Sequence, residues 1–334
     1  MIPVKEKVSG GKWLRVAVSF AILAFILTRV DFNVFAGTLS KLNPAWMLLA
    51  LFLILLEQAV LALSWIAMLA GKGLHVPFRP MTHILVVSNF LGFALPSGMG
   101  SDVVKVVGLA KYMSNTKEAL SSLVVFRAIG FAMLFMIAIL AAAVFPRHLP
   151  DKPVIHTLIQ ALAVVVVAGM AGVALAKPFL DAIGGILKFA GMDRFHGRLV
   201  ELHDSFMAYV ANPASMLKAS AGAFLIQSNR IACVYIASLA LGLSVDPADF
   251  CLFIPVIAAM LLIPVSVSGI GVREGGFVVL FGYAGLSAGE ALSLSLTTFS
   301  FDIVFMLFGG AVYWIAGFPN AEALTKAQDE SSSL

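Results

Sequence analysis

Long uninterrupted apolar runs dominate this sequence and decide what the chain can fold into. A helix needs about 20 apolar residues to cross a hydrocarbon core about 30 Å thick. Six runs approach or exceed that length, at residues 13–30, 44–70, 120–145, 154–176, 216–243 and 292–315. Composition agrees, because 60% of the 334 residues are hydrophobic and only 12% are charged, against about 25% charged in a soluble domain. We therefore predict an all-α fold, a polytopic membrane helix bundle that forms a single integral membrane domain over residues 1–334.

Two further apolar segments, residues 79–112 and 248–285, are interrupted near their middle. The breaks contain Ser97, Gly98 and Gly100 in the first segment and Ser268, Gly269 and Gly271 in the second. Irregular backbone at membrane depth is tolerated only inside protein or beside a wet cavity. At about 1.5 Å per residue, the arm 80–95 is too short to cross comfortably. We predict two re-entrant helical hairpins; the alternative is a kinked helix followed by an interfacial helix.

Each interrupted segment opens a similar series of features. In both, the order is an apolar arm, a small-residue break, a charged helix start, a second arm, an acidic turn and a long span. This predicts a repeat, with residues 79–145 as the first hairpin-plus-span unit and 248–317 as the second. Three full crossings lie between the two breaks, so the units would be inverted relative to each other, as in many secondary transporters.

The distribution of Lys and Arg sets the orientation. If both termini lie in the cytoplasm, most basic residues of loops and span ends fall on the cytoplasmic side, among them Lys72, Lys117 and Lys177. Such a bias is typical of cytoplasmic loops. The polar stretch 177–213 lies on the same side, and its mixed apolar and charged residues predict an interfacial amphipathic segment. The net charge of +4 therefore reflects topology and does not indicate a nucleic-acid partner.

Eight ionisable residues fall inside or beside the apolar segments. They are Glu57, Arg127, Arg230 and Asp302 on predicted spans, and Asp102, Lys105, Arg273 and Glu274 on the second arms of the hairpins. A charge near the bilayer centre costs roughly 2.5–3.5 kcal/mol on insertion scales. Four acids balance four bases, so mutual neutralisation is one interpretation. A site for a polar cargo is the other.

The charges of the hairpins favour an anionic or zwitterionic lipid headgroup as the cargo. Ser101 and Asp102 follow the first break and begin a helix, whose N-terminus suits phosphate. Lys105 lies on the same face as Asp102, and Arg273 supplies a planar fork for phosphate oxygens. The predicted substrate site comprises Ser97, Gly98, Gly100, Asp102, Lys105, Arg127, Arg230, Ser268, Gly269, Gly271, Arg273 and Glu274. Glu57 and Asp302 are candidates for proton coupling or ion pairing, and passive exchange is the alternative.

Motifs for other chemistries are missing from the sequence. The glycine pattern at 269–275 lacks the βαβ context of a dinucleotide site. The two cysteines, Cys233 and Cys251, have no metal-like spacing and suit a core position. We therefore predict no catalytic residues, no cofactor, no metal and no enzymatic activity.

The motifs at 95–102 and 269–275 resemble those of the lysylphosphatidylglycerol synthase transmembrane-region family, and the resemblance covers roughly residues 13–317. Asp102 and Lys105 stand where that family is expected to have Glu and Arg, and Lys cannot form a bidentate fork. The resemblance implies a flippase in the bacterial plasma (inner) membrane, with a phospholipid, polyprenyl-type or hopanoid-type lipid as its substrate. The chain ends shortly after the last apolar run, so the aminoacyl-transfer activity of two-domain synthases is not expected. A non-catalytic subunit working with envelope-lipid biosynthesis enzymes, or a lipid-modifying transferase, are the alternatives.

Overall fold

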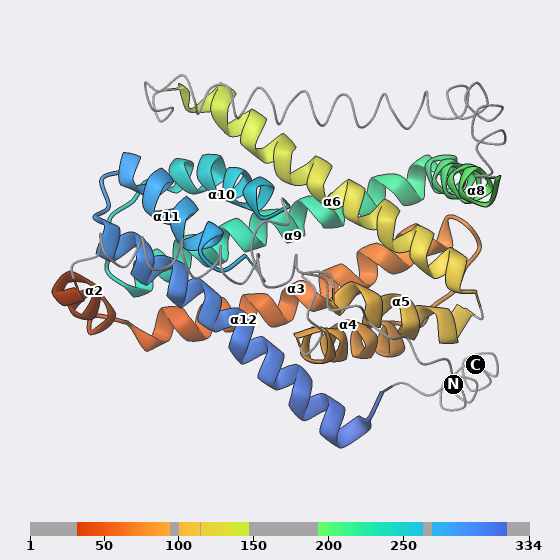
Figure 1. The fold of residues 1–334 in the computed structure, drawn as a ribbon, viewed down its shortest axis with the longest axis horizontal. Helices are drawn as coiled ribbons and strands as arrows, with labels where there is room; N and C mark the ends of the chain where they lie inside the picture. Colours follow the sequence, from red (N-terminus) through yellow and green to blue (C-terminus); the bar gives the residue numbers. More distant parts are fainter. Residues whose placement is uncertain (1–31, 94–99, 114, 147–192, 263–268, 319–334) are drawn as a thin grey trace.

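The computed structural model describes residues 32–93, 100–113, 115–146, 193–262 and 269–318, and all contacts below lie within these ranges. The described residues form α-helices and contain no β-strand. The predicted all-α class is therefore confirmed for this part of the chain (Figure 1).

Four of the helices are long and apolar enough to cross a membrane. They are α3 (Pro44–Ala70), α6 (Thr116–Val144), α9 (Pro213–Ala240) and α12 (Ala288–Ala316). Each begins after a polar residue whose side chain accepts a hydrogen bond from a backbone N–H of the first turn: Asn43, Asn115, Asn212 and Ser287. Such caps satisfy amides that have no partner within the helix. The other predicted spans, 13–30 and 154–176, lie outside the described residues, so the total of six spans stays a prediction.

Helices α3 and α9 pack antiparallel in the middle of the bundle (Figure 1). At one end, Asn43 N donates a hydrogen bond to Ala240 O over 2.7 Å. At the other end, Gly71 packs so closely on Ser215 that an added Cβ would lie 2.7 Å from Ser215 Cβ. These contacts define two ends of the bundle, the Ala240 end and the Ser215 end.

The first interrupted segment forms an antiparallel helix pair. Helices α4 (Phe78–Phe93) and α5 (Gly100–Met113) meet where Gly108 packs on Ile84 and where Gly92 packs on the backbone of Ser101. The pair follows the end of α3 and precedes the start of α6, so it leaves and returns at the Ser215 end.

The second interrupted segment forms a matching pair at the Ala240 end. Its helices are α10 (Pro247–Leu262) and α11 (Val272–Tyr283). Gly276 of α11 packs on Ile257 of α10, and Gly269, in the turn before α11, packs on Leu261 of α10. Figure 1 shows the two pairs at opposite ends of the bundle. Both segments are thus helical hairpins, while their re-entry into a bilayer stays a prediction.

The packing of the helices is reciprocal between the two halves of the chain. Helix α4 packs on α12 and α10 packs on α6, while α5 packs on α6 and α11 packs on α12. Two flanking helices follow the same rule, since α2 (Phe32–Leu39) packs on α12 and α8 (Asp193–Val210) packs on α6. A two-fold axis through the α3–α9 contact would produce this pattern. It supports an inverted repeat wider than the predicted 79–145 and 248–317, whose boundaries stay predictions.

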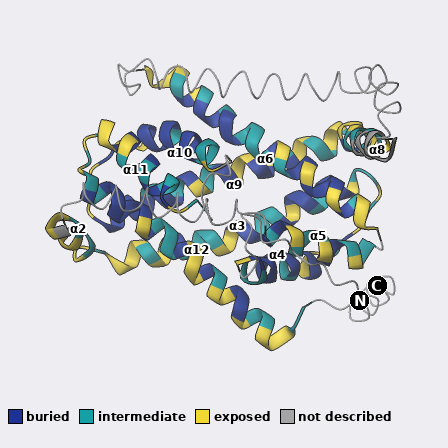
Figure 2. Cartoon of the chain, in the orientation of Figure 1, coloured by how far each residue is buried: buried dark blue, intermediate teal, exposed yellow. Residues whose placement is uncertain are grey.

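Helix α8 covers the described part of the predicted interfacial segment 177–213 and is anchored at the Ser215 end. Tyr209 is buried, and its hydroxyl donates a hydrogen bond to Glu118 Oε1 over 2.6 Å. Lys72 Nζ forms an ion pair with the same oxygen at 2.7 Å and lies over the Tyr209 ring. Burial raises the pKa of Tyr209, and the hydrogen bond and negative charge of Glu118 raise it further. Figure 2 shows buried residues concentrated where the helices face one another.

Candidate functional site

Four charged residues of the long helices lie close to the middle of those helices. Glu57 is the central residue of α3, and Asp302 is the central residue of α12. Arg127 and Arg230 lie within about one turn of the centres of α6 and α9. If these helices cross a bilayer, all four charges fall near its midplane, where an ionised group is costly.

The first cluster joins the first hairpin to α6. Asp102 lies in the first turn of α5 and is 3% exposed. Its Oδ2 atom forms an ion pair with Arg127 Nη2, and its Oδ1 atom lies 3.5 Å from Lys105 Nζ. The acid is therefore held between two bases on two different helices.

A second pair links the two central helices. Arg230 Nε lies 2.9 Å from Glu57 Oε1, and Asn229 Nδ2 donates a hydrogen bond to Glu57 Oε2 over 3.1 Å. Both oxygens of a buried carboxylate are thus satisfied, as burial of a charge requires. Arg230 itself is not sealed in, because its side chain is 52% exposed.

The charges of the second hairpin form a third cluster. Arg273 Nη1 lies 3.6 Å from Asp302 Oδ2, Arg273 Nε lies 3.6 Å from Glu274 Oε1, and the guanidinium lies over the Phe299 ring at 4.3 Å. Glu274 Oε2 also accepts a hydrogen bond from Gly271 N over 2.6 Å, which caps α11. Gly271 has φ +85°, a conformation that favours glycine.

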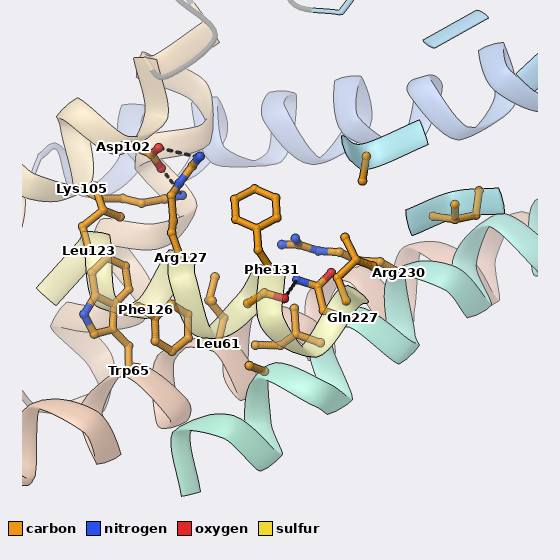
Figure 3. Close-up of a pocket in the computed structure, with 16 residues that line it drawn as sticks. Leu61, Trp65, Asp102, Lys105, Leu123, Phe126, Arg127, Phe131, Gln227 and Arg230 are labelled. Carbon is orange, nitrogen blue, oxygen red and sulfur yellow. Dashed lines mark hydrogen bonds and ion pairs between the residues drawn. The ribbon is translucent and has the colours of Figure 1, made fainter. Parts of the chain in front are cut away.

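A cavity of about 270 Å³ lies between the helices of the first half, α9 and the first arm of the second hairpin (Figure 3). Its polar lining residues are Asp102, Lys105, Arg127, Gln227 and Arg230, and its aromatic ones are Trp65, Phe126 and Phe131. Gln227 Nε2 donates a hydrogen bond to Gly130 O over 3.1 Å and ties α9 to α6 at the cavity wall. Arg127 and Arg230 therefore line one cavity from two helices that are hydrogen-bonded to each other.

The structure brings together only part of the predicted substrate site. Asp102, Lys105, Arg127 and Arg230 line the cavity, and Glu57 supports it through Arg230. Arg273, Glu274 and Asp302 do not line it; the second hairpin contributes Ile254 and Ala258 instead. Gly100 is the first residue of α5, and Gly269 and Gly271 shape the turn before α11. Ser97, Gly98 and Ser268 lie outside the described residues.

Several cavity residues had no sequence prediction. Gln227 and Phe131 are separated from Arg230 and Arg127 by three and four positions along α9 and α6, the spacing that places helical side chains on one face. That spacing could have identified Gln227 and Phe131 as neighbours of the two arginines. Trp65 of the cavity wall and Asn229, which binds Glu57 outside the cavity, had no such signal, because their contacts depend on how α3, α6 and α9 are rotated against each other.

The sequence as a whole also places the chain in a known family. The family model described as the lysylphosphatidylglycerol synthase TM region matches residues 12–310, nearly the whole chain. The chain belongs to this family. The resemblance seen in its two glycine motifs is thereby confirmed, and the membrane-spanning character of the helices agrees with it. No curated protein and no solved structure matches the chain.

Proposed function

We propose that this protein moves a membrane lipid with an anionic or zwitterionic headgroup between the two leaflets. The observation that carries the proposal is the cavity at the depth of the helix centres, whose mostly apolar wall contains Lys105 and two arginines. A lipid headgroup crossing hydrocarbon loses its water and needs polar partners at that depth. Phospholipids and polyprenyl-type or hopanoid-type envelope lipids are the candidate cargo.

Mutual neutralisation alone does not account for the exposure of these charges. The side chains of Arg127, Arg230 and Asp302 are 41%, 52% and 71% exposed. Charged groups that only satisfy each other would be expected to be sealed within the bundle, because contact with lipid tails is unfavourable. Their exposure supports a groove that admits water or a headgroup.

The proposal includes a bacterial plasma (inner) membrane location, cytoplasmic termini, and transport without catalysis, cofactor or metal. Glu57 and Asp302 are the candidates for proton coupling, with passive exchange as the alternative. A non-catalytic partner of envelope-lipid biosynthesis enzymes and a lipid-modifying transferase are the alternative functions.

Leaflet exchange in liposomes tests the proposal. The purified protein is reconstituted with a fluorescent phospholipid, and an impermeant reductant quenches the outer leaflet, with and without an imposed pH gradient. We expect protein-containing liposomes to lose fluorescence beyond the outer-leaflet fraction, while empty and heat-denatured controls do not. No exchange under either condition contradicts the proposal, and a new lipid species in the extract would indicate a transferase.

A further inference from the structure

The charges around the cavity do not balance. Three bases line it, namely Lys105, Arg127 and Arg230, against one acid, Asp102. Adding Glu57, which binds Arg230 from outside the lining, still leaves one positive charge in excess. The opposite excess lies in the third cluster, where Arg273 faces both Glu274 and Asp302. The charges of the eight residues sum to zero, whereas the charges around the cavity sum to a positive excess.

The two arginines keep part of their hydrogen-bonding capacity for a ligand. Glu57 contacts Arg230 through Nε, so the terminal nitrogens of the fork are directed into the cavity (Figure 3). Asp102 contacts Arg127 through one terminal nitrogen, and the Arg127 side chain is still 41% exposed. Arginine forks bind phosphate oxygens in pairs.

Two of the three aromatic residues of the cavity, Trp65 and Phe126, do not favour a quaternary ammonium group, and Phe131 is the one partly exposed ring that remains. Such a cation binds to open aromatic faces. Trp65 and Phe126 are 1% and 7% exposed, and their rings stack on each other with centroids 5.2 Å apart. Their faces are therefore largely covered, and Asp102 is already held by Arg127 and Lys105.

We infer that the cavity binds the phosphate of an anionic lipid headgroup, with Arg127 and Arg230 as a two-sided clamp and Lys105 as the source of the excess charge. This inference rests on the proposed transport function and narrows its cargo. A phosphodiester carries one negative charge and neutralises the excess, whereas a zwitterionic headgroup brings in a second cation that finds no free acid in the described lining.

Ligand-induced thermal stabilisation tests this inference without requiring transport. The full chain, in a neutral detergent, is titrated with dihexanoyl-phosphatidylglycerol, dihexanoyl-phosphatidylcholine or glycerol 3-phosphate, and each rise in Tm is converted to an apparent Kd. We expect the phosphatidylglycerol to bind about tenfold more tightly than the phosphatidylcholine, because the choline cation is repelled by the positive excess of the cavity. Glycerol 3-phosphate should bind more weakly than the lipid.

Variants of the chain test whether the cavity residues bind the phosphate or whether any positive charge on the protein would have the same effect. Asp102→Asn/Arg127→Gln removes an acid and a base together and should weaken phosphatidylglycerol binding about tenfold. Lys218→Gln, an exposed cation on α9 outside the cavity, is the matched control and should leave the Kd unchanged. If the double variant does not fold, Lys105→Gln removes the excess charge and should abolish the preference between the two lipids.

Three results would overturn the inference: equal affinity for both lipids, glycerol 3-phosphate binding as tightly as the lipid, or cavity variants with unchanged Kd. The result of this titration can be distinguished from the result of the leaflet-exchange assay. Leaflet exchange without anionic preference removes this inference alone, and anionic preference without leaflet exchange removes the proposed function alone.

Discussion

At the scale of single residues, the partners of an ionisable side chain decide whether it holds helices together or lies at the cavity. Glu118 receives a hydrogen bond from Tyr209 and an ion pair from Lys72, and the three together fix α8 to the ends of α3 and α6. Glu274 both faces Arg273 and caps α11. Asp102 by contrast lies at the cavity, where the same kind of pairing leaves its arginine partly exposed.

The Tyr209 contact makes a prediction about stability. Tyr209→Phe removes the hydrogen bond to Glu118 and leaves a partly buried carboxylate with one donor fewer. We expect the detergent-solubilised protein to lose about 1.5–3 kcal/mol, the usual contribution of a hydrogen bond to a charged group, measured as a lower Tm. Tyr283→Phe, at an exposed position on α11, is the control and should leave the Tm unchanged.

The same residue predicts a pH dependence. The pKa of Tyr209 is raised in the folded protein by burial and by Glu118, so the folded state keeps the proton after the unfolded chain, with a pKa of about 10, has released it. The stability difference between the wild type and Tyr209→Phe should therefore be constant below about pH 10 and shrink above it. A difference that grows at alkaline pH would contradict this assignment.

At the scale of elements, each hairpin depends on close helix contact. Gly92 faces Ser101 so closely that an added Cβ would lie 2.2 Å from Ser101 N and 2.3 Å from Ser101 Cα. Backbone atoms cannot rotate away, and Ser101 immediately precedes Asp102. The geometry of the hairpin and the position of the cavity acid are therefore coupled.

Gly92→Ala tests this coupling. The two arms should separate at their tip, with a loss of about 1–3 kcal/mol from overpacking and a slower leaflet exchange as Asp102 moves from Arg127. Gly282→Ala in α11 is a matched control, because nothing lies within 4 Å of its added Cβ. Wild-type Tm and exchange rate in Gly92→Ala would show that the arms tolerate separation.

Much of this element-level organisation was predictable from the sequence. Apolar length predicted α3, α6, α9 and α12, and the small-residue breaks predicted both hairpins. Their positions along the chain also predicted that Glu57, Arg230 and Asp302 lie near the centres of long helices. It could not predict that Asp102 pairs with Arg127 while Arg273 turns to Asp302, because partner choice depends on the rotation of each helix about its axis.

At the scale of the whole molecule, the two hairpins lie at opposite ends of a bundle organised around α3 and α9 (Figure 1). The positive excess lines a cavity built by helices of both halves of the chain, and the acidic excess lies around Arg273. A headgroup that reaches the depth of the helix centres therefore meets the positive excess.

The orientation itself can be measured by cysteine labelling. In a Cys233→Ala/Cys251→Ala background, Lys41→Cys near the Ala240 end and Lys218→Cys near the Ser215 end place thiols at exposed positions. An impermeant maleimide should label Lys41→Cys in intact cells and Lys218→Cys only after permeabilisation. The reverse pattern would place the Ser215 end outside and contradict the positive-inside assignment.

Leaflet exchange by a variant in which uncharged side chains replace Glu57 and Arg230 tests directly whether these charges bind the headgroup. Glu57→Gln/Arg230→Gln removes one acid and one base that contact each other at 2.9 Å, and the two amides still offer each other hydrogen bonds. We predict a Tm close to that of the wild type and an exchange rate at least about tenfold lower, as loss of a charge-assisted hydrogen bond to the passing headgroup would give. A folded double variant that exchanges lipid at the wild-type rate would show that this pair serves only to neutralise itself, and would contradict the account.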